Sequence, residues 1–173
     1  MSIDPLHVDV AALLVRVALG PMLVIHGYNK IFGPGGLTGT AGWFESLGLR
    51  PAWIHARLAA VTEIGAGILM TVGLVTGLAA AAFVGLMLVA ALTDHRGKGY
   101  FVFKGGSEYV LLVALVAVGV AALGPGRWSL DHALGLESMS GGVWWAVGSL
   151  VAGILAAGGL LAACYRPTTS SAD

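Results

Sequence analysis

One uninterrupted apolar stretch, residues 58–92, restricts the fold of this sequence more than any other feature. Over its 35 residues, the apolar and small side chains are interrupted only by three threonines and Glu63. A helix needs about 20 apolar residues to cross a bilayer, so the stretch is too long for one span and suits two short ones. Gly73 and Gly77 mark the one plausible turn within it. We therefore predict a hairpin of two transmembrane helices.

Three further apolar segments have the length of membrane spans, at about residues 10–32, 108–123 and 142–164. Charged residues make up only 10% of the chain and hydrophobic residues 57%, whereas a soluble domain carries about a quarter charged residues. So few charges cannot cover the surface of a water-soluble globule. The sequence predicts an all-α membrane protein, a four-helix transmembrane bundle plus a C-terminal fifth transmembrane helix, with the lipid bilayer as its solvent.

The remaining composition excludes several classes of function. The net charge is zero, and nucleic-acid binding needs a basic surface, so we expect no nucleic-acid partner. Cys164 is the single cysteine, which rules out an intrachain disulfide, and we expect no metal site. The acidic N-terminus lacks the basic region of a signal peptide. In the connector 33–57, Trp43 and Phe44 among few charges favour a short helix at the membrane interface.

The basic residues predict an orientation. Seven fall on the side that the first helix reaches at its end, namely Lys30, Arg50, Arg57, Arg96, Lys98, Lys104 and Arg166. Arg16 and Arg127 fall on the other side. Cytoplasmic loops carry the excess of Lys and Arg, so we expect the N-terminus outside and the C-terminus in the cytoplasm.

Ionisable side chains within membrane spans cost free energy and are normally paired or functional. Here several helices bring such groups to the same cytoplasmic leaflet, and we expect them to line one polar pocket: His26, Lys30, Glu63, His95 and Glu108. Asn29 lies beside Lys30. Arg16 is 14 residues before Lys30, nearly four turns, and so falls on the same stripe of the first helix.

Each of these residues also has a purely structural interpretation. Lys30 could extend to the interface and anchor its helix. His26 could bond a neighbouring backbone carbonyl, and Arg16 could pair with Glu63 or with a carbonyl. Glu63 is the hardest to explain in this way because it lies within an apolar run, although a structural pair with Lys30 remains an alternative.

Several segments, in order along the chain, resemble the DoxX family of small bacterial integral membrane proteins. They are LVRVALG at 14–20, His26-Gly27 with KIFG at 30–33, GWFESLGL at 42–49, EIGAG at 63–67, Asp94-His95, GGSEY at 105–109 and GPGRWSLD at 124–131. The resemblance covers residues 12–132. It divides the chain into a four-helix core at 1–132, a loop with an extra transmembrane helix at 133–165, and a tail at 166–173 that we expect to be disordered.

The resemblance implies a function because the family is similar to the membrane subunit of thiosulfate:quinone oxidoreductase. Relatives are described as membrane anchors of an oxidoreductase complex that joins sulfur transfer to superoxide detoxification. We therefore expect a bacterial plasma-membrane subunit of a redox complex that is not catalytic alone, binds a quinone and receives electrons from a protein partner. The catalytic residues would be Glu63 and Glu108, which exchange protons. The quinone-binding set would be His26, Lys30, Asn29, His95 and Arg16.

Two other functions fit the same sequence. The chain could be a non-enzymatic scaffold or assembly factor that recruits cytoplasmic partners through the connectors 33–57 and 94–107. It could also be a small transporter of protons or of an anion that uses the same polar stripe. A homo-oligomer is compatible with each of these functions.

Overall fold

The computed structural model describes residues 5–167, except for the side chain of Met139. Most of the tail that we expect to be disordered therefore lies outside the described residues. Within them the chain forms seven α-helices: α1 Pro5–Phe32, α2 Gly36–Ser46, α3 Ala52–Val72, α4 Thr76–Leu92, α5 Glu108–Leu123, α6 Leu130–Ala133 and α7 Val143–Cys164. Two single-turn 3₁₀ helices, η1 Val102–Lys104 and η2 Glu137–Met139, lie in the connectors. The predicted all-helical class is confirmed.

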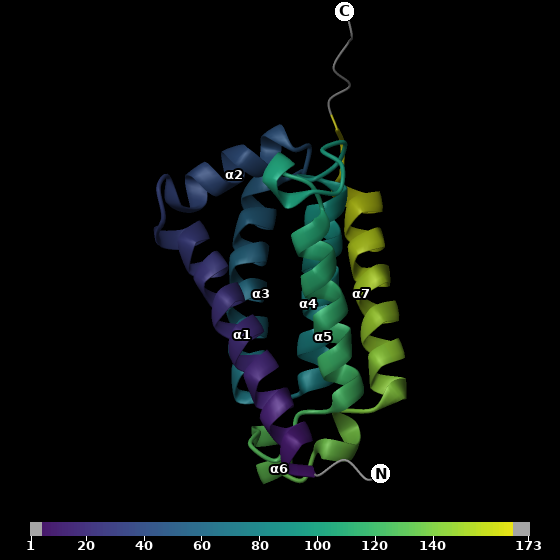
Figure 1. Cartoon of the computed structure of the whole chain (residues 1–173). Coiled ribbons are helices and arrows are strands. Elements are labelled where there is room, and N and C mark those ends of the chain that lie inside the picture. The colour runs from purple at the N-terminus through teal and green to yellow at the C-terminus, as the bar shows by residue number, and fades with distance from the viewer. Residues whose placement is uncertain (1–4, 168–173) are drawn as a thin grey trace, which may run out of the picture.

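The helices form a bundle whose two ends differ (Figure 1). α1 and α3 pair on one side, while α4, α5 and α7 pack together on the other. The short helix α2 crosses one end of the bundle and α6 lies at the opposite end, so we call these the α2 end and the α6 end. The fifth long helix, α7, packs on α4 and α5 rather than projecting from the bundle.

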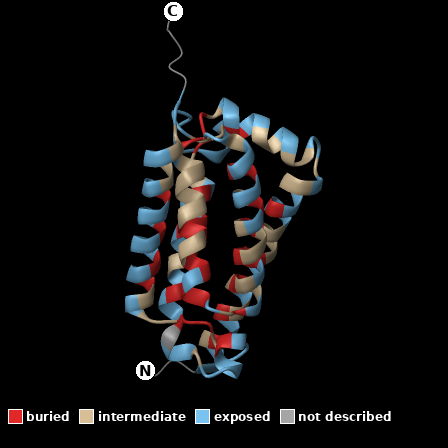
Figure 2. Cartoon of the chain, turned by 180° about the vertical axis from the view of Figure 1, so that it is seen from behind, coloured by how far each residue is buried: buried red, intermediate tan, exposed pale blue. Residues whose placement is uncertain are grey.

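Apolar side chains cover the outside of the bundle as well as its core. Figure 2 shows buried residues on the inward faces of the helices and exposed residues on the outward faces. The outward faces carry large hydrophobic residues such as Leu14, Val61 and Leu155, each at least 64% exposed. α1 and α7 are long and apolar enough to cross a membrane, and α4 and α5 are shorter apolar helices. Such a surface is stable in lipid, in agreement with the predicted membrane protein; the number of spans stays a prediction.

Glycine lets α1 and α3 approach closely. A Cβ atom on Gly67 of α3 would lie 2.6 Å from the carbonyl oxygen of Gly20 on α1, and a Cβ on Gly27 would lie 2.8 Å from the carbonyl oxygen of Ala60. Small residues at such contacts allow the backbones of membrane helices to pack directly on one another.

Replacing Gly67 by leucine should therefore force α1 and α3 apart. We expect a loss of about 1–3 kcal/mol in the free energy of unfolding, the usual cost of overpacking. Thermal unfolding in a detergent micelle measures it. The matched control is Gly65→Leu on the same helix, because a Cβ there has no neighbour within 4 Å. An equal loss in both variants would contradict the close contact.

The hydrophobic core lies mostly in the half of the bundle toward the α6 end. Its buried members come from four helices and are Leu19, Leu23, Ala66, Met70, Ala79, Ala80, Phe83, Val113, Ala117, Val120 and Ala121. In α3 they occupy the second half of the helix and in α4 the first half, because these two helices run in opposite directions. Much of the half toward the α2 end is left for the cavity described below.

The predicted hairpin between 58 and 92 turns at residues 73–75, and a carboxylate from the short helix α6 completes it. Gly73 ends α3 with φ 66°, and Val75 takes the left-handed conformation with φ 43°. Asp131, fully buried, accepts hydrogen bonds from the backbone N–H groups of Val75 at 2.7 Å and Thr76 at 3.0 Å, and from the Thr76 hydroxyl at 2.8 Å. The first N–H groups of a helix have no partner within the helix, and here Asp131 provides one.

Arg16 lies near this turn, toward the α6 end of α1. Its guanidinium is buried and donates hydrogen bonds to the carbonyl oxygens of Thr71 at 3.2 Å and Trp128 at 2.6 Å. The charge of Asp131 also attracts it. The sequence offered two structural interpretations of Arg16, an ion pair with Glu63 and a hydrogen bond to a backbone carbonyl. The structure shows the second. Arg16 lies near the α6 end of α1, whereas Lys30 lies near the α2 end.

Candidate functional site

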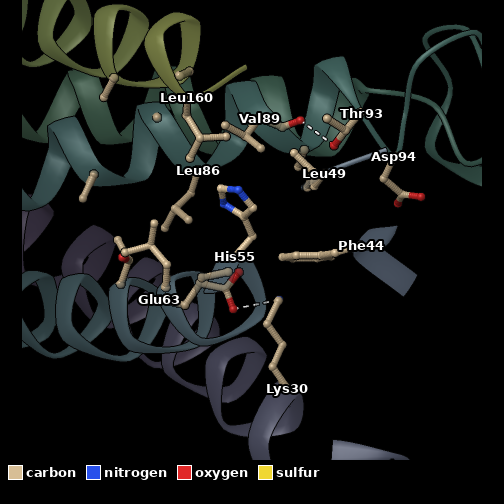
Figure 3. Close-up of a pocket in the computed structure, with 18 of the residues that line it drawn as sticks. Lys30, Phe44, Leu49, His55, Glu63, Leu86, Val89, Thr93, Asp94 and Leu160 are labelled. Atoms are coloured by element: carbon tan, nitrogen blue, oxygen red, sulfur yellow. Dashed lines mark hydrogen bonds and ion pairs between the residues drawn. The ribbon is translucent and has the colours of Figure 1, made fainter. Parts of the chain in front are cut away.

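A cavity of about 470 Å³ lies between α3, α4 and α7, from the α2 end of the bundle along α4 as far as Leu78. Most of its lining is aliphatic, from Leu58 on α3, Leu86 and Val89 on α4 and Leu160 on α7. Figure 3 shows these walls with the polar side chains that reach between them. α7, which lies outside the region of the family resemblance, thus forms one wall of the candidate site.

The polar centre of the cavity is an ion pair between α1 and α3. Lys30 Nζ lies 2.8 Å from Glu63 Oε2, and the two side chains are only 13% and 10% exposed. The close packing of α1 on α3 accounts for this geometry, because a Cβ on Gly27 would lie 3.0 Å from the Cβ of Glu63. Lys30 follows Gly27 by one turn and reaches across to the carboxylate. The structure thus joins Lys30 to Glu63, one of the pairings that the sequence left open.

The hydrogen bond between Lys30 and Glu63 leaves further donors on the ammonium and an acceptor oxygen on the carboxylate unused. An ammonium group has three donors, and a carboxylate has two acceptor oxygens. In the described part of the chain, Glu63 Oε2 is the one partner of the Lys30 ammonium, and Oε1 of Glu63 accepts no hydrogen bond. Both residues line the cavity. A ligand with a carbonyl or hydroxyl group could therefore bond to either of them.

His55 is a cavity residue that the sequence interpretation missed. It lies in the first turn of α3, is buried, and its Nε2 is 3.3 Å from the carbonyl oxygen of Arg50. In Figure 3 its ring projects into the space between the Glu63 side and the Val89 side. The sequence pattern predicts a connector over residues 33–57, whereas α3 begins at Ala52. With the helix extended back, His55, Ala59 and Glu63 recur at four-residue spacing and share one face.

At the α2 end, the backbone of residues 48–50 pairs with the backbone of residues 164–166 beside the cavity. The N–H of Arg50 donates to the carbonyl of Cys164 at 2.9 Å, and the N–H of Arg166 donates to the carbonyl of Gly48 at 2.7 Å. Leu49, which lines the cavity, pairs with Tyr165 as an antiparallel bridge. The end of α7 is thereby tied to the loop between α2 and α3.

The side of the cavity is open toward the membrane-facing surface. Leu58 on α3 and Leu78 on α4 line the cavity and are nevertheless 49% and 62% exposed. Trp43 on α2 is 43% exposed and lines it as well. An apolar molecule dissolved in lipid could therefore enter sideways, without crossing the polar end of the bundle.

The other predicted site residues do not line this cavity, so the expected single pocket is corrected. His26 and Asn29 are exposed on α1 and do not line the cavity. His26 Nδ1 lies 2.8 Å from the carbonyl oxygen of Met22, which is the bond to a neighbouring carbonyl that the structural interpretation predicted. His95 lies in a separate groove and Nδ1 is 2.6 Å from the Gly105 carbonyl oxygen. Glu108 begins α5. Sequence position gives how far along its helix each residue lies, but the face that each presents depends on how its helix is rotated.

A helical bundle with lipid-facing outer surfaces and a cavity open to one side defines a membrane protein with an internal ligand-sized site. Comparison with known proteins then identifies its family. The sequence profile of DoxX matches residues 11–96, and the chain belongs to the DoxX family.

Two relatives are similar over most of their length. A protein of Bacillus subtilis (strain 168) named "Putative oxidoreductase CatD" is 32% identical over 123 residues, which are 71% of this chain and 86% of the relative. The membrane protein Rv3486 of Mycobacterium tuberculosis (strain ATCC 25618 / H37Rv) is 29% identical over 134 residues, 72% of this chain and 81% of the relative. No solved structure matches the chain significantly.

Proposed function

We propose that this protein is a membrane subunit of a quinone-linked redox complex, and that the cavity between α3, α4 and α7 binds the quinone head group. The observation that carries the proposal is the Lys30–Glu63 ion pair inside an apolar cavity that opens toward lipid. Ligand sites commonly combine mostly apolar walls with a few convergent polar groups. The name of the Bacillus subtilis relative adds a link to redox chemistry.

The cavity suits a quinone in size and in polarity. Its volume of about 470 Å³ falls within the range of roughly 300–1,000 Å³ that is typical of small-molecule sites. The flat ring would lie between the aliphatic walls of α4 and α7, and its isoprenoid tail would leave past Leu58 and Leu78 into the bilayer. Lys30 would donate a hydrogen bond to one carbonyl oxygen. The residues present therefore fit the group.

The two charged residues have distinct roles in this proposal. Reduction of a quinone to a quinol consumes two electrons and two protons. The electrons come from a redox protein that associates with this subunit. Lys30 would orient the head group and pair with the ionised Glu63 carboxylate. As the electrons arrive, Glu63 would take up one proton from the cytoplasmic side and pass it to the nearer carbonyl oxygen, as a positioned general acid does. The second proton would also be taken up from the cytoplasmic side, for the other carbonyl oxygen. The apolar walls exclude bulk water from this exchange.

The proposed setting is a bacterial plasma membrane crossed by the five long helices, with the α2 end in the cytoplasm. This orientation follows the excess of basic residues at the α2 end. The proton-exchanging carboxylate would then lie in the cytoplasmic leaflet. The packed core between α1, α3, α4 and α5 disfavours the alternative of a transport path across the membrane.

Filling the cavity tests quinone binding directly. Ala59 of α3 lines the cavity between His55 and Glu63, so Ala59→Phe should place a ring where the head group lies. We expect at least about a tenfold loss of affinity for a short-chain ubiquinone, equivalent to about 1.4 kcal/mol, measured by calorimetric titration of the purified protein. The matched control is Val61→Phe, on the same helix but 67% exposed on its outer face.

The proton role needs a second variant, Glu63→Gln, which keeps the shape of the side chain but cannot ionise. We expect the purified complex to lose quinone reduction while the variant still binds the short-chain quinone. Glu45→Gln, an exposed glutamate of α2, is the control. Unchanged turnover with Glu63→Gln would reject the proton role, and unchanged binding with Ala59→Phe would reject the quinone site.

A further inference from the structure

A second surface site lies on a different face of α4, in a groove between α4 and α5 at the α2 end. Its apolar part is formed by Leu88 and Leu92 of α4 and by Leu111 of α5. Leu92 and Leu111 are 51% and 38% exposed, so the groove opens to the outer surface of the bundle. Its polar end is formed by the connector between α4 and α5, through His95, Arg96 and Ser107.

The polar end carries one basic side chain, Arg96, without an ion-pair partner among the described residues. Arg96 is exposed. Asp94 contacts other basic groups, with Oδ1 3.1 Å from Lys98 Nζ and Oδ2 3.9 Å from His95 Nε2, and Glu108 Oε2 accepts the N–H of Val102 at 3.0 Å. His95 bonds to the Gly105 carbonyl. An anion at the mouth of the groove would therefore meet the Arg96 guanidinium without displacing an existing partner.

Aromatic side chains on the same connector place this polar end at the boundary between lipid and water. Phe101 and Phe103 are stacked, with ring centroids 5.3 Å apart, and are 52% and 77% exposed. Tyr100, beside them, is 58% exposed. Figure 1 shows this connector at the same end of the bundle as α2. Trp and Tyr side chains at the ends of membrane helices commonly lie at the level of the lipid headgroups, and Tyr100 is such a residue.

We propose that the α4–α5 groove binds an anionic phospholipid. One acyl chain would lie along Leu88, Leu92 and Leu111, and the phosphate would face Arg96 and Ser107. The ligand must be both apolar and anionic, because the groove joins an aliphatic surface to a basic side chain without an ion-pair partner among the described residues, and basic groups beside membrane helices commonly recognise such lipids. This site is separate from the cavity and does not depend on quinone binding.

Native mass spectrometry of the purified protein in a non-ionic detergent tests the proposal. Phosphatidylglycerol is titrated against phosphatidylcholine with the same acyl chains, and glycerol phosphate serves as a headgroup without chains. We expect the first lipid to bind more tightly than the second. Arg96→Gln should weaken phosphatidylglycerol binding about fivefold, the effect of one basic residue near an anionic membrane surface, and leave phosphatidylcholine unchanged.

Two further variants separate the parts of the site. Ala91 lines the apolar part of the groove, so Ala91→Phe should weaken binding of both lipids. Arg57→Gln is the matched control, because Arg57 does not line the groove. Its Cζ lies over the Trp53 ring of α3, 5.5 Å from the ring centroid. Equal affinity for the two lipids, or unchanged binding in Arg96→Gln or Ala91→Phe, would overturn the proposal. So would glycerol phosphate competing as strongly as the lipid, or a soluble protein bound there in its place.

Discussion

Replacing Lys30 by methionine is expected to destabilise the protein by about 3 kcal/mol. The change keeps the aliphatic stem of the side chain but leaves the Glu63 carboxylate, only 10% exposed, without its ionic partner. Removing one member of a buried ion pair commonly costs about 3–5 kcal/mol, and the lower value applies here because the cavity opens to one side. Thermal or denaturant unfolding in detergent micelles measures the effect.

The double variant Lys30→Met, Glu63→Leu should recover most of this loss, because it removes the uncompensated charge as well. Lys104→Met provides the control, since Lys104 is an exposed basic residue at the same end of the bundle. If Lys30→Met were as stable as Lys104→Met, the ion pair would not support the fold. The double variant also separates stability from function, because it should fold well and yet fail to reduce a quinone.

The second large effect is expected at Asp131. Its carboxylate accepts three hydrogen bonds, two from backbone N–H groups at the start of α4 and one from the buried Thr76 hydroxyl. A buried donor that loses its partner costs about 1–3 kcal/mol. Asp131→Ala should therefore lower the free energy of unfolding by about 3–5 kcal/mol, since it also removes the charge that attracts buried Arg16.

Asp131→Asn should cost less, because the amide oxygen can still accept one of these hydrogen bonds. The comparison variant is Glu137→Ala in the same connector, whose ion pair with His132 is exposed to solvent. Exposed pairs contribute about 0–1 kcal/mol. Unfolding curves of the three variants in one detergent give the order of stability. Asp131→Ala and Glu137→Ala at equal stability would show that the carboxylate does not hold the turn.

Sequence patterns were sufficient for the helices because lipid imposes a simple requirement on them. Every backbone group in a bilayer must be bonded within the protein, so each long apolar segment had to be helical. The turn at residues 73–75 and the end of α5 before Gly124 followed from glycine and proline positions. The starts of two helices were exceptions: α1 begins at Pro5, before the predicted residue 10, and α3 begins at Ala52, before the predicted Leu58. Because His55 and Arg57 interrupt the apolar pattern before Leu58, the six helical residues 52–57 were not predicted, and His55 was missed with them.

The candidate site could be predicted only in part. Glu63 stood out because a charge in an apolar helix needs a partner, and the structure supplies Lys30, one of the partners that the sequence left open. The rest of the expected pocket did not assemble. Sequence position gives the depth of His26, His95 and Glu108 along their helices, but small differences in helix rotation decide whether a side chain faces a cavity, a groove or the outside.

By itself, the sequence determined the solvent of this protein, its all-helical class and the burial of Glu63, because these depend on hydrophobicity along single segments. Tertiary structure alone decided that Arg16 bonds to carbonyls near the α6 end while Lys30 pairs with Glu63 toward the α2 end. It also decided that Asp131 accepts the N–H groups at the start of α4, and that α7 forms a wall of the cavity. Those outcomes depend on contacts between residues far apart in the chain. Such contacts are set by how helices pack on one another, which no single apolar segment encodes.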